Sequence, residues 1–197
     1  MITVKAASAP NRLYAAVCLA AAFLFLALAL NAAWIPVKAE LAQWLIERSW
    51  QSGGQARPWP WADTRPAAVL EVPDHGVRLL VLEGNSGRNL AFGPVFSDGT
   101  AQENDMVISG HRDTHFDFLQ RVKPGDRLLI IRRSGEMQYE VVQTDIVDSR
   151  RAELMIDPGM HRVSLVTCYP FDRANAGGPL RYVVTALPVS PRSASSG

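Results

Sequence analysis

The stretch RLLIIRRSGEMQYEVVQTDIVD, residues 127–148, shows what kind of structure this chain builds. Apolar and β-branched residues form two runs, one on each side of a Ser-Gly-Glu turn. Such runs are typical of β-strands, and turn residues between them separate one strand from the next. The stretch therefore predicts two strands.

Six further segments have the same character, and one short helix is expected at residues 115–122. Eight strands with so little helix do not form a doubly wound sheet, which needs a helix between parallel strands. The pattern predicts an all-β domain folded as a closed or nearly closed β-barrel, with a β-sandwich as the alternative. The six segments are AAVLEV (67–72), VRLLVLE (77–83), NLAF (89–92), DMVISG (105–110), RVSLVTC (162–168) and LRYVVTAL (180–187).

The chain before this domain begins with a long apolar segment. No charged residue occurs from position 13 to position 30, and a helix over 13–35 would cross a hydrocarbon core of about 30 Å. Lys5 and Arg12 precede it without an acidic residue, so the positive-inside rule leaves residues 1–12 in the cytoplasm. We expect a transmembrane anchor with the rest of the chain outside. A cleaved signal peptide is the alternative, but the apolar run exceeds the usual length of about 7–15 residues.

Between the anchor and the barrel, residues 36–66 divide into two parts. Residues 37–50 place apolar side chains at near-helical spacing and predict a juxtamembrane helix. Residues 51–66 contain paired glycines and several prolines and predict a linker without regular structure. The barrel itself is expected over residues 67–188, and residues 189–197 predict a disordered tail because they are poor in apolar side chains.

Composition limits the functions that are open to the chain. With 197 residues, 48% of them apolar, it can form one packed domain with an appendage. The formal net charge is +1 and the basic residues form no stripe, which argues against a nucleic-acid partner. Of the two cysteines, Cys18 lies in the apolar segment and Cys168 is alone in the barrel, so no disulfide is expected there. Cys168 is then either a buried inert side chain or a reactive thiol.

Three polar residues stand at the ends of expected strands, where a rigid scaffold presents side chains to a cleft. They are His111, Cys168 and Arg181. A free thiol has a pKa near 8.5 and needs a neighbouring base or positive charge to act as a nucleophile at neutral pH. An imidazole can accept and return its proton, and a guanidinium can stabilise an oxyanion. Together they would suit acyl transfer.

Each residue also has a simpler interpretation. Of the other histidines, His75 and His161 lie in turn-like contexts and are expected to be solvated, whereas His115 competes with His111 for a catalytic role. Asp113 could orient His111, but an N-cap of the short helix is the better interpretation, with Thr114 as another possible cap.

The run GHRDTHFD matches no zinc-ligand spacing, so neither a metal nor a cofactor is expected.

In the order His, Cys, Arg, the three motifs resemble the sortases, which are membrane-anchored cysteine transpeptidases. SLVTC (164–168) is similar to the TLxTC signature around the sortase nucleophile, with Ser164 in place of the first threonine. SGHRDTHF (109–116) resembles the histidine motif, and LRYVV (180–184) supplies the arginine. PWPWADTRPAAVL (58–70) and CYPF (168–171) look like the Gram-negative, proteobacterial branch of the family.

The resemblance implies an eight-stranded β-barrel and a specific reaction. Cys168 would attack the Thr–Gly carbonyl of an LPxTG-like C-terminal sorting signal in a protein substrate, and an amine would resolve the thioacyl enzyme. By the same resemblance His111 is the acid and base, Arg181 steadies the substrate and its oxyanion, and Thr167 supports the oxyanion site. The enzyme would sit in the inner membrane with its catalytic domain in the periplasm. Some sortases use calcium, but no suitable carboxylate cluster is apparent here and none is expected to be required.

Two other functions remain open at this point. One is another anchored cysteine enzyme, a hydrolase, a peptidase or a peptidoglycan transpeptidase, since water and an amine compete for the same thioester. The other is a non-catalytic β-barrel that binds a partner in the cell envelope, with Cys168 buried and inert.

Overall fold

The computed structural model describes residues 12–84, 86–97, 99–100, 104–151, 156–157, 159–172 and 177–189. Contacts between residues divide the chain into two units, Met1–Leu41 and Ala42–Gly197. The expectations for a cytoplasmic segment before residue 12 and for a disordered tail after residue 189 concern positions outside the described residues.

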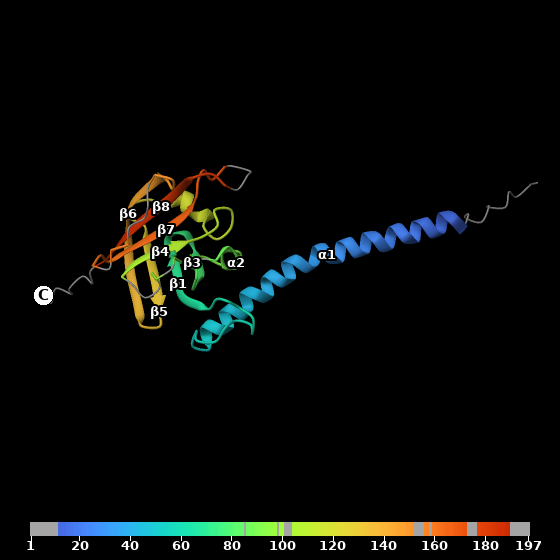
Figure 1. Ribbon diagram of the computed structural model, residues 1–197, viewed down its shortest axis with the longest axis horizontal. Helices are drawn as coiled ribbons and strands as arrows, with labels where there is room; N and C mark the ends of the chain where they lie inside the picture. The colour runs from blue at the N-terminus through green and yellow to red at the C-terminus, as the bar shows by residue number, and fades with distance from the viewer. Residues whose placement is uncertain are drawn as a thin grey trace, which may run out of the picture. The chain divides into compact units, whose positions relative to one another are not determined.

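The helix α1, Arg12–Gln51, runs from the first unit into the second (Figure 1). In the first unit its described side chains are exposed, and many of them are large and apolar: Tyr14, Val17, Leu19, Phe23, Leu24, Phe25, Leu26 and Leu28. Among the residues that the structure describes, no helix combines the length and apolarity needed to cross a membrane. The amphipathic helix expected over residues 37–50 lies within α1.

The last turns of α1 belong to the second unit and pack on its barrel. Ile46 is 1% exposed and contacts Leu82 and Val95. Glu47 pairs with Arg78 at 3.1 Å, on the polar side of the same turns. The helix therefore ends with one apolar face on the barrel, as expected from its spacing of apolar residues. Residues 52–65 form turns and bends, and the first strand begins directly after them.

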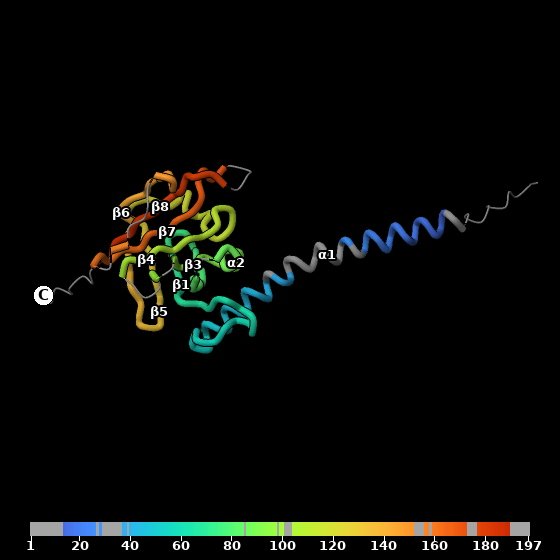
Figure 2. The backbone as a smooth tube through the Cα atoms, viewed as in Figure 1, coloured from blue at the N-terminus to red at the C-terminus, as the bar shows by residue number. Residues whose placement is uncertain are grey.

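The second unit is a closed barrel of eight strands in the order β1-β2-β3-β4-β7-β8-β6-β5 (Figures 1 and 2). This confirms the barrel and excludes the β-sandwich. Two pairs of neighbours are parallel, β2 with β3 and β4 with β7, and the others are antiparallel. The strands are β1 (Pro66–Val72), β2 (Val77–Leu82), β3 (Val95–Phe96), β4 (Asp105–Ser109), β5 (Arg127–Arg132), β6 (Gly135–Asp148), β7 (Arg162–Cys168) and β8 (Leu180–Pro188).

The barrel interior is filled by inward-facing side chains of nearly every strand, joined by residues from the segment after β4. Along β1 and β7 buried positions alternate or run together, as expected where strands face a closed core. The largest fully buried side chains include Leu70, Phe96, Met106, Ile108, Phe116, Leu119, Leu128, Ile130, Tyr139 and Leu165.

A buried ion pair joins the first residues of β4 and β7. Asp105 is 0% exposed and faces Arg162 directly across the parallel ladder. The guanidinium donates two hydrogen bonds to the carboxylate, at 2.9 and 2.7 Å, and the backbone N–H of Asp157 donates a third at 2.9 Å. Every partner that a buried carboxylate needs is thus supplied by the chain around it.

Seven of the expected strands occur where the sequence places them, and one does not. NLAF was expected to be a strand, but residues Gly87–Leu90 form the short helix α2 instead. The Ser86 hydroxyl accepts a hydrogen bond from the Asn89 backbone N–H at 3.2 Å, which favours a helix start over a strand. The eighth strand is β3, only two residues long, further along the chain.

The other two short helices are 3-10 helices, η1 (Pro73–His75) and η2 (Asp117–Arg121). η2 lies within the helix expected at residues 115–122. The expectation that His75 is solvated is wrong: its side chain is 14% exposed, and its Nε2 lies 2.8 Å from Oδ2 of Asp126. His161, in contrast, is exposed as expected.

Candidate active site

The ends of three adjacent strands, β4, β7 and β8, carry the three residues singled out by the sequence (Figure 2). Cys168 ends β7 and lies directly opposite Arg181 in the antiparallel ladder with β8. Side chains of such opposite residues lie on the same face of the sheet, with Cβ atoms about 4.5–5.5 Å apart. The fold therefore brings together a thiol and a guanidinium that are separated by a loop in the sequence.

His111 reaches the same place through the parallel pairing of β4 with β7. Paired residues of these strands are separated by 57 positions, from Asp105 and Arg162 onward. The pairing continues past the end of β4, where the Gly110 N–H donates to the Val166 carbonyl at 3.1 Å. The paired register ends at Ser109 and Val166, and His111 and Cys168 each follow two residues later on their own segments. The three residues thus occupy one end of the barrel, with Cys168 on the middle strand.

Thr167, which precedes Cys168, and Gly110, which precedes His111, join the two strand ends by a hydrogen bond. The hydroxyl of Thr167 donates to the Gly110 carbonyl at 2.8 Å, and Thr167 is only 2% exposed. Its hydroxyl is therefore occupied by a hydrogen bond inside the barrel. Cys168, the next residue, has its side chain on the other face of the strand and is partly exposed.

Arg181 has two backbone partners close by. Its Nη1 donates to the carbonyls of Gly178 at 2.7 Å and Leu180 at 2.9 Å. These bonds fix the guanidinium relative to the start of β8. One of its nitrogens is thus committed to the chain, and Nε and Nη2 are the donors that a substrate would have to use.

His111 opens a tight turn that closes at Phe116. The Phe116 backbone N–H donates to the His111 carbonyl at 2.9 Å, which folds the segment back on itself. His115 lies on the same turn, and burial, together with the nearby charge of His111, lowers its pKa below the ordinary 6.5. The protonated form of His115 is therefore disfavoured.

The sequence interpretation missed Arg112. Its side chain is 4% exposed, and its Nε and Nη2 donate to Asp113 at 2.6 and 3.0 Å while Nη1 donates to the Pro170 carbonyl at 2.6 Å. An arginine between a histidine and an aspartate suggests a solvated charge, so nothing in the pattern indicated burial. Asp113 does not cap η2, whose N-cap is Phe116 without a side-chain bond. Its carboxylate instead pairs with Arg112.

Aromatic rings gather around the turn that follows Cys168. Tyr169 and Tyr182 are stacked with ring centroids 6.3 Å apart, and Phe171 meets Tyr182 edge-on at 5.3 Å. The peptide bond between Tyr169 and Pro170 is cis. The rings give the turn after β7 an apolar body packed on β8.

Metal ligation has no obvious place here. In the described part of the chain, no three His, Cys, Asp or Glu side chains are grouped so that they could hold a metal ion.

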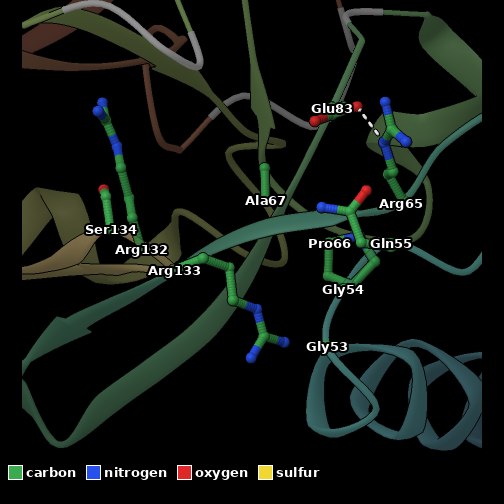
Figure 3. A pocket seen from close by; sticks show the side chains of 10 residues that line it. All are labelled: Gly53, Gly54, Gln55, Arg65, Pro66, Ala67, Glu83, Arg132, Arg133 and Ser134. Carbon is green, nitrogen blue, oxygen red and sulfur yellow. Dashed lines mark hydrogen bonds and ion pairs between the residues drawn. The ribbon is translucent and has the colours of Figure 1, made fainter.

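A separate cavity of about 300 Å³ opens beside the segment that follows α1 (Figure 3). It is lined by polar and charged groups, including Arg65, Glu83, Arg132 and Arg133. The guanidinium groups of Arg132 and Arg133 point away from each other, and Arg65 is turned to its ion-pair partner Glu83 at 2.6 Å (Figure 3). These cations do not converge on one ligand position.

Replacing Gly110 with alanine is expected to disturb both stability and the site. A Cβ built on Gly110 would lie 2.7–2.9 Å from three ring carbons of the fully buried Phe116, closer than packed carbons approach. We expect a loss of about 1–3 kcal/mol in unfolding free energy, measured by denaturant titration. Gly87→Ala is the matched control, because nothing lies within 4 Å of its Cβ position. Equal stability of the two variants would contradict this packing.

Fold and site define a class of protein: a closed β-barrel that presents a thiol, an imidazole and a guanidinium at the ends of three neighbouring strands. A family model described as the sortase domain matches residues 70–189. The chain belongs to the sortase family.

Known sortases are similar in both sequence and structure. Sortase D of Bacillus subtilis is 31% identical over 125 residues, which cover 60% of this chain and 61% of that protein. Sortase A of Listeria monocytogenes is 28% identical and matched over 47% of its length. The chain thus spans about half to three fifths of these relatives.

Solved structures carry the same fold. Sortase A from Corynebacterium diphtheriae has a TM-score of 0.56 at 26% identity, covering 68% of this chain and 65% of that one. Sortase C-1 from Actinomyces oris has a TM-score of 0.54 at 27% identity, covering 64% and 76%.

Proposed function

We propose that this protein is a cysteine transpeptidase that cleaves an LPxTG-like C-terminal sorting signal and transfers the shortened protein to an amine. The observation that carries the proposal is the register of three strands: Cys168 is opposite Arg181, and the β4–β7 ladder ends two residues before His111 and two residues before Cys168. Sortase family members are cysteine transpeptidases, which supports the same reaction.

In the first half-reaction the Cys168 sulfur bonds to the threonine carbonyl carbon. The proton of the thiol passes to His111, and the negative charge that develops on the carbonyl oxygen is stabilised by Arg181. The C–N bond to glycine then breaks. The glycine nitrogen keeps the electron pair and takes the proton from His111, which leaves a thioester on Cys168.

In the second half-reaction an amine attacks the thioester carbon. A new C–N bond forms, the C–S bond breaks, and the sulfur leaves with the electron pair. His111 takes the proton that the amine loses and returns it to the thiol. Water can take the place of the amine, in which case the product is a carboxylic acid and the enzyme acts as a hydrolase.

The proposal includes attachment to the inner membrane through residues 13–35, with the N-terminus in the cytoplasm and the barrel in the periplasm. The uncharged sequence and the exposed apolar side chains from Tyr14 to Leu28 support it. It further assigns the chain to the proteobacterial branch on the likeness of PWPWADTRPAAVL and CYPF. The relatives named above come from Gram-positive bacteria and lend that assignment no support.

The reaction is tested with the full chain in a non-ionic detergent and a labelled peptide that contains an LPxTG-like signal. Mass spectrometry should find the acyl group on Cys168 and, after a short glycine peptide is added as the amine, the ligated product. A peptide with an N-methylated Thr–Gly bond is the control. Acid product alone in the presence of the amine would favour a hydrolase. A folded protein that forms no acyl adduct while its thiol reacts with alkylating reagents would exclude the transpeptidase.

Arg181→Lys is expected to lower kcat/KM for the peptide by about 100-fold, because the point charge of lysine does not reproduce the planar fork of donors. Arg150→Lys is the matched control: Arg150 also forms a two-bond pair, with Asp148 at 3.0 and 2.7 Å, but its side chain is 70% exposed. The measurement is the rate of peptide cleavage by each of the two variants. An Arg181→Lys enzyme as active as the control would remove the guanidinium from the mechanism.

A further inference from the structure

Arg112 connects the two segments that carry His111 and Cys168. It follows His111 in the sequence, and its Nη1 donates a hydrogen bond of 2.6 Å to the carbonyl of Pro170, two residues after Cys168. These segments are 58 residues apart in the chain. The side chain thus joins the end of β4 to the turn after β7, and at 4% exposure it is held away from water.

Burying a guanidinium costs free energy unless it is hydrogen-bonded and paired. Asp113 supplies the pair, with Nε and Nη2 of Arg112 donating to its two oxygens. The Asp113 side chain, however, is 62% exposed, so water screens its charge far more than that of the buried cation. At this end of the barrel, the electrostatic effect of the Arg112 charge is therefore stronger than that of the Asp113 charge.

Cys168 is within electrostatic range of this cation. The pKa of Arg112 lies above its ordinary value, chiefly through the hydrogen bonds to Asp113 against the opposing effect of burial, and the negative charges of Asp113, Cys168 and Asp172 add to it. An interaction that favours the cation beside a thiolate equally favours the thiolate beside the cation.

The other charged groups around the thiol come from each strand end. Arg181 faces Cys168 from β8, His111 follows the end of β4, and Asp172 follows Cys168 in the chain and acts on Arg112 with its negative charge. Arg181 has its Nη1 bound to backbone carbonyls, and His111 changes charge during the reaction. Arg112 is the buried cation at this end whose charge is constant through the cycle.

We propose that Arg112 is a positioning residue that ties the His111 turn to the Cys168 turn and supplies a permanent positive charge that favours the Cys168 thiolate. This inference rests on the proposed role of Cys168 as the nucleophile. It extends the site from three residues to four and assigns a task to a side chain that does not itself touch the substrate.

The test measures the alkylation of Cys168 by iodoacetamide against pH in the full chain, in a Cys18→Ser background, without any sorting peptide. Arg112→Gln keeps a donor for the Pro170 carbonyl but removes the charge. We expect the pH of half-maximal alkylation rate to rise by about one unit, and the rate at neutral pH to fall about tenfold. Arg112→Lys keeps the charge and should restore most of the rate. Arg121→Gln, at an exposed position of η2, should leave the profile unchanged.

The variant Asp113→Asn should shift the pH profile of Cys168 alkylation in the opposite direction. It removes the carboxylate that partly neutralises Arg112, so the profile should move to lower pH. If Arg112→Gln fails to fold, this variant and Arg112→Lys still decide the question. An unshifted profile in Asp113→Asn, or the same loss in Arg112→Lys as in Arg112→Gln, would overturn the inference. Alkylation needs no sorting peptide, so its pH profile can be measured even in a protein that lacks transpeptidase activity. Failure of the proposed function is thus distinguished from failure of this inference.

Discussion

Cys168→Ala is expected to abolish formation of the acyl enzyme and to reduce peptide cleavage by at least about 10⁴-fold. The proposed reaction forms and breaks a bond to this sulfur, and alanine offers no nucleophile in its place. Since Cys168 is partly exposed, the loss of its sulfur should alter stability little. Thermal unfolding of the variant should therefore match that of the wild type while the acyl adduct is lost.

Cys18→Ala is the matched control for this experiment. Cys18 is the other free cysteine and lies on the exposed surface of α1, outside the barrel. We expect it to leave cleavage unchanged. Residual adduct formation in Cys168→Ala, or a loss of activity in Cys18→Ala, would show that the nucleophile has been assigned to the wrong thiol.

Asp105→Ala is expected to cost about 3–5 kcal/mol of unfolding free energy, because it leaves the Arg162 guanidinium without its carboxylate in a largely buried position. Asp117→Ala is the control. Asp117 also pairs with an arginine, Arg121 at 3.5 Å, but both side chains are more than half exposed, so its loss should cost under about 1 kcal/mol. Denaturant titrations of the two variants give the comparison, and similar costs would contradict a stabilising role for the buried pair.

The same ion pair should make stability depend on pH in the acidic range. Burial alone would raise the pKa of Asp105, but the hydrogen bonds from Arg162 and the Asp157 N–H outweigh it and hold the pKa below the ordinary 3.8. A carboxyl group with a lowered pKa in the folded state contributes its full stabilisation above the unfolded-state pKa. That contribution is lost as the pH falls below about 4, through the folded-state pKa. Asp105→Ala should accordingly show a weaker loss of stability between about pH 4 and pH 2.

The barrel could be predicted largely because its strands are locally patterned. The runs around residues 127–148 contain enough β-branched and apolar residues to be recognised without any partner. The strand β3 could not be predicted, because two residues are too few to show an alternating pattern. It is defined by its pairing with β2 and β4. NLAF looked like a strand by its apolar content, but the Ser86 cap turned it into a helix.

The candidate site residues could be proposed from the sequence, whereas the side chains that support them could not. His111, Cys168 and Arg181 were chosen because each follows or begins an apolar run and has reactive chemistry. Arg112 was missed because the burial of a charged residue depends on partners far away in sequence, here the Pro170 carbonyl. The parallel pairing of β4 with β7 was equally invisible, since register between distant strands leaves no trace in either strand alone.

The place of β8 in the ring of strands has a consequence for folding. β8 pairs with both β6 and β7, so the ring of strands closes only when it docks. The same strand carries Arg181, opposite Cys168. Closing the barrel wall and bringing this guanidinium beside the thiol are therefore a single event.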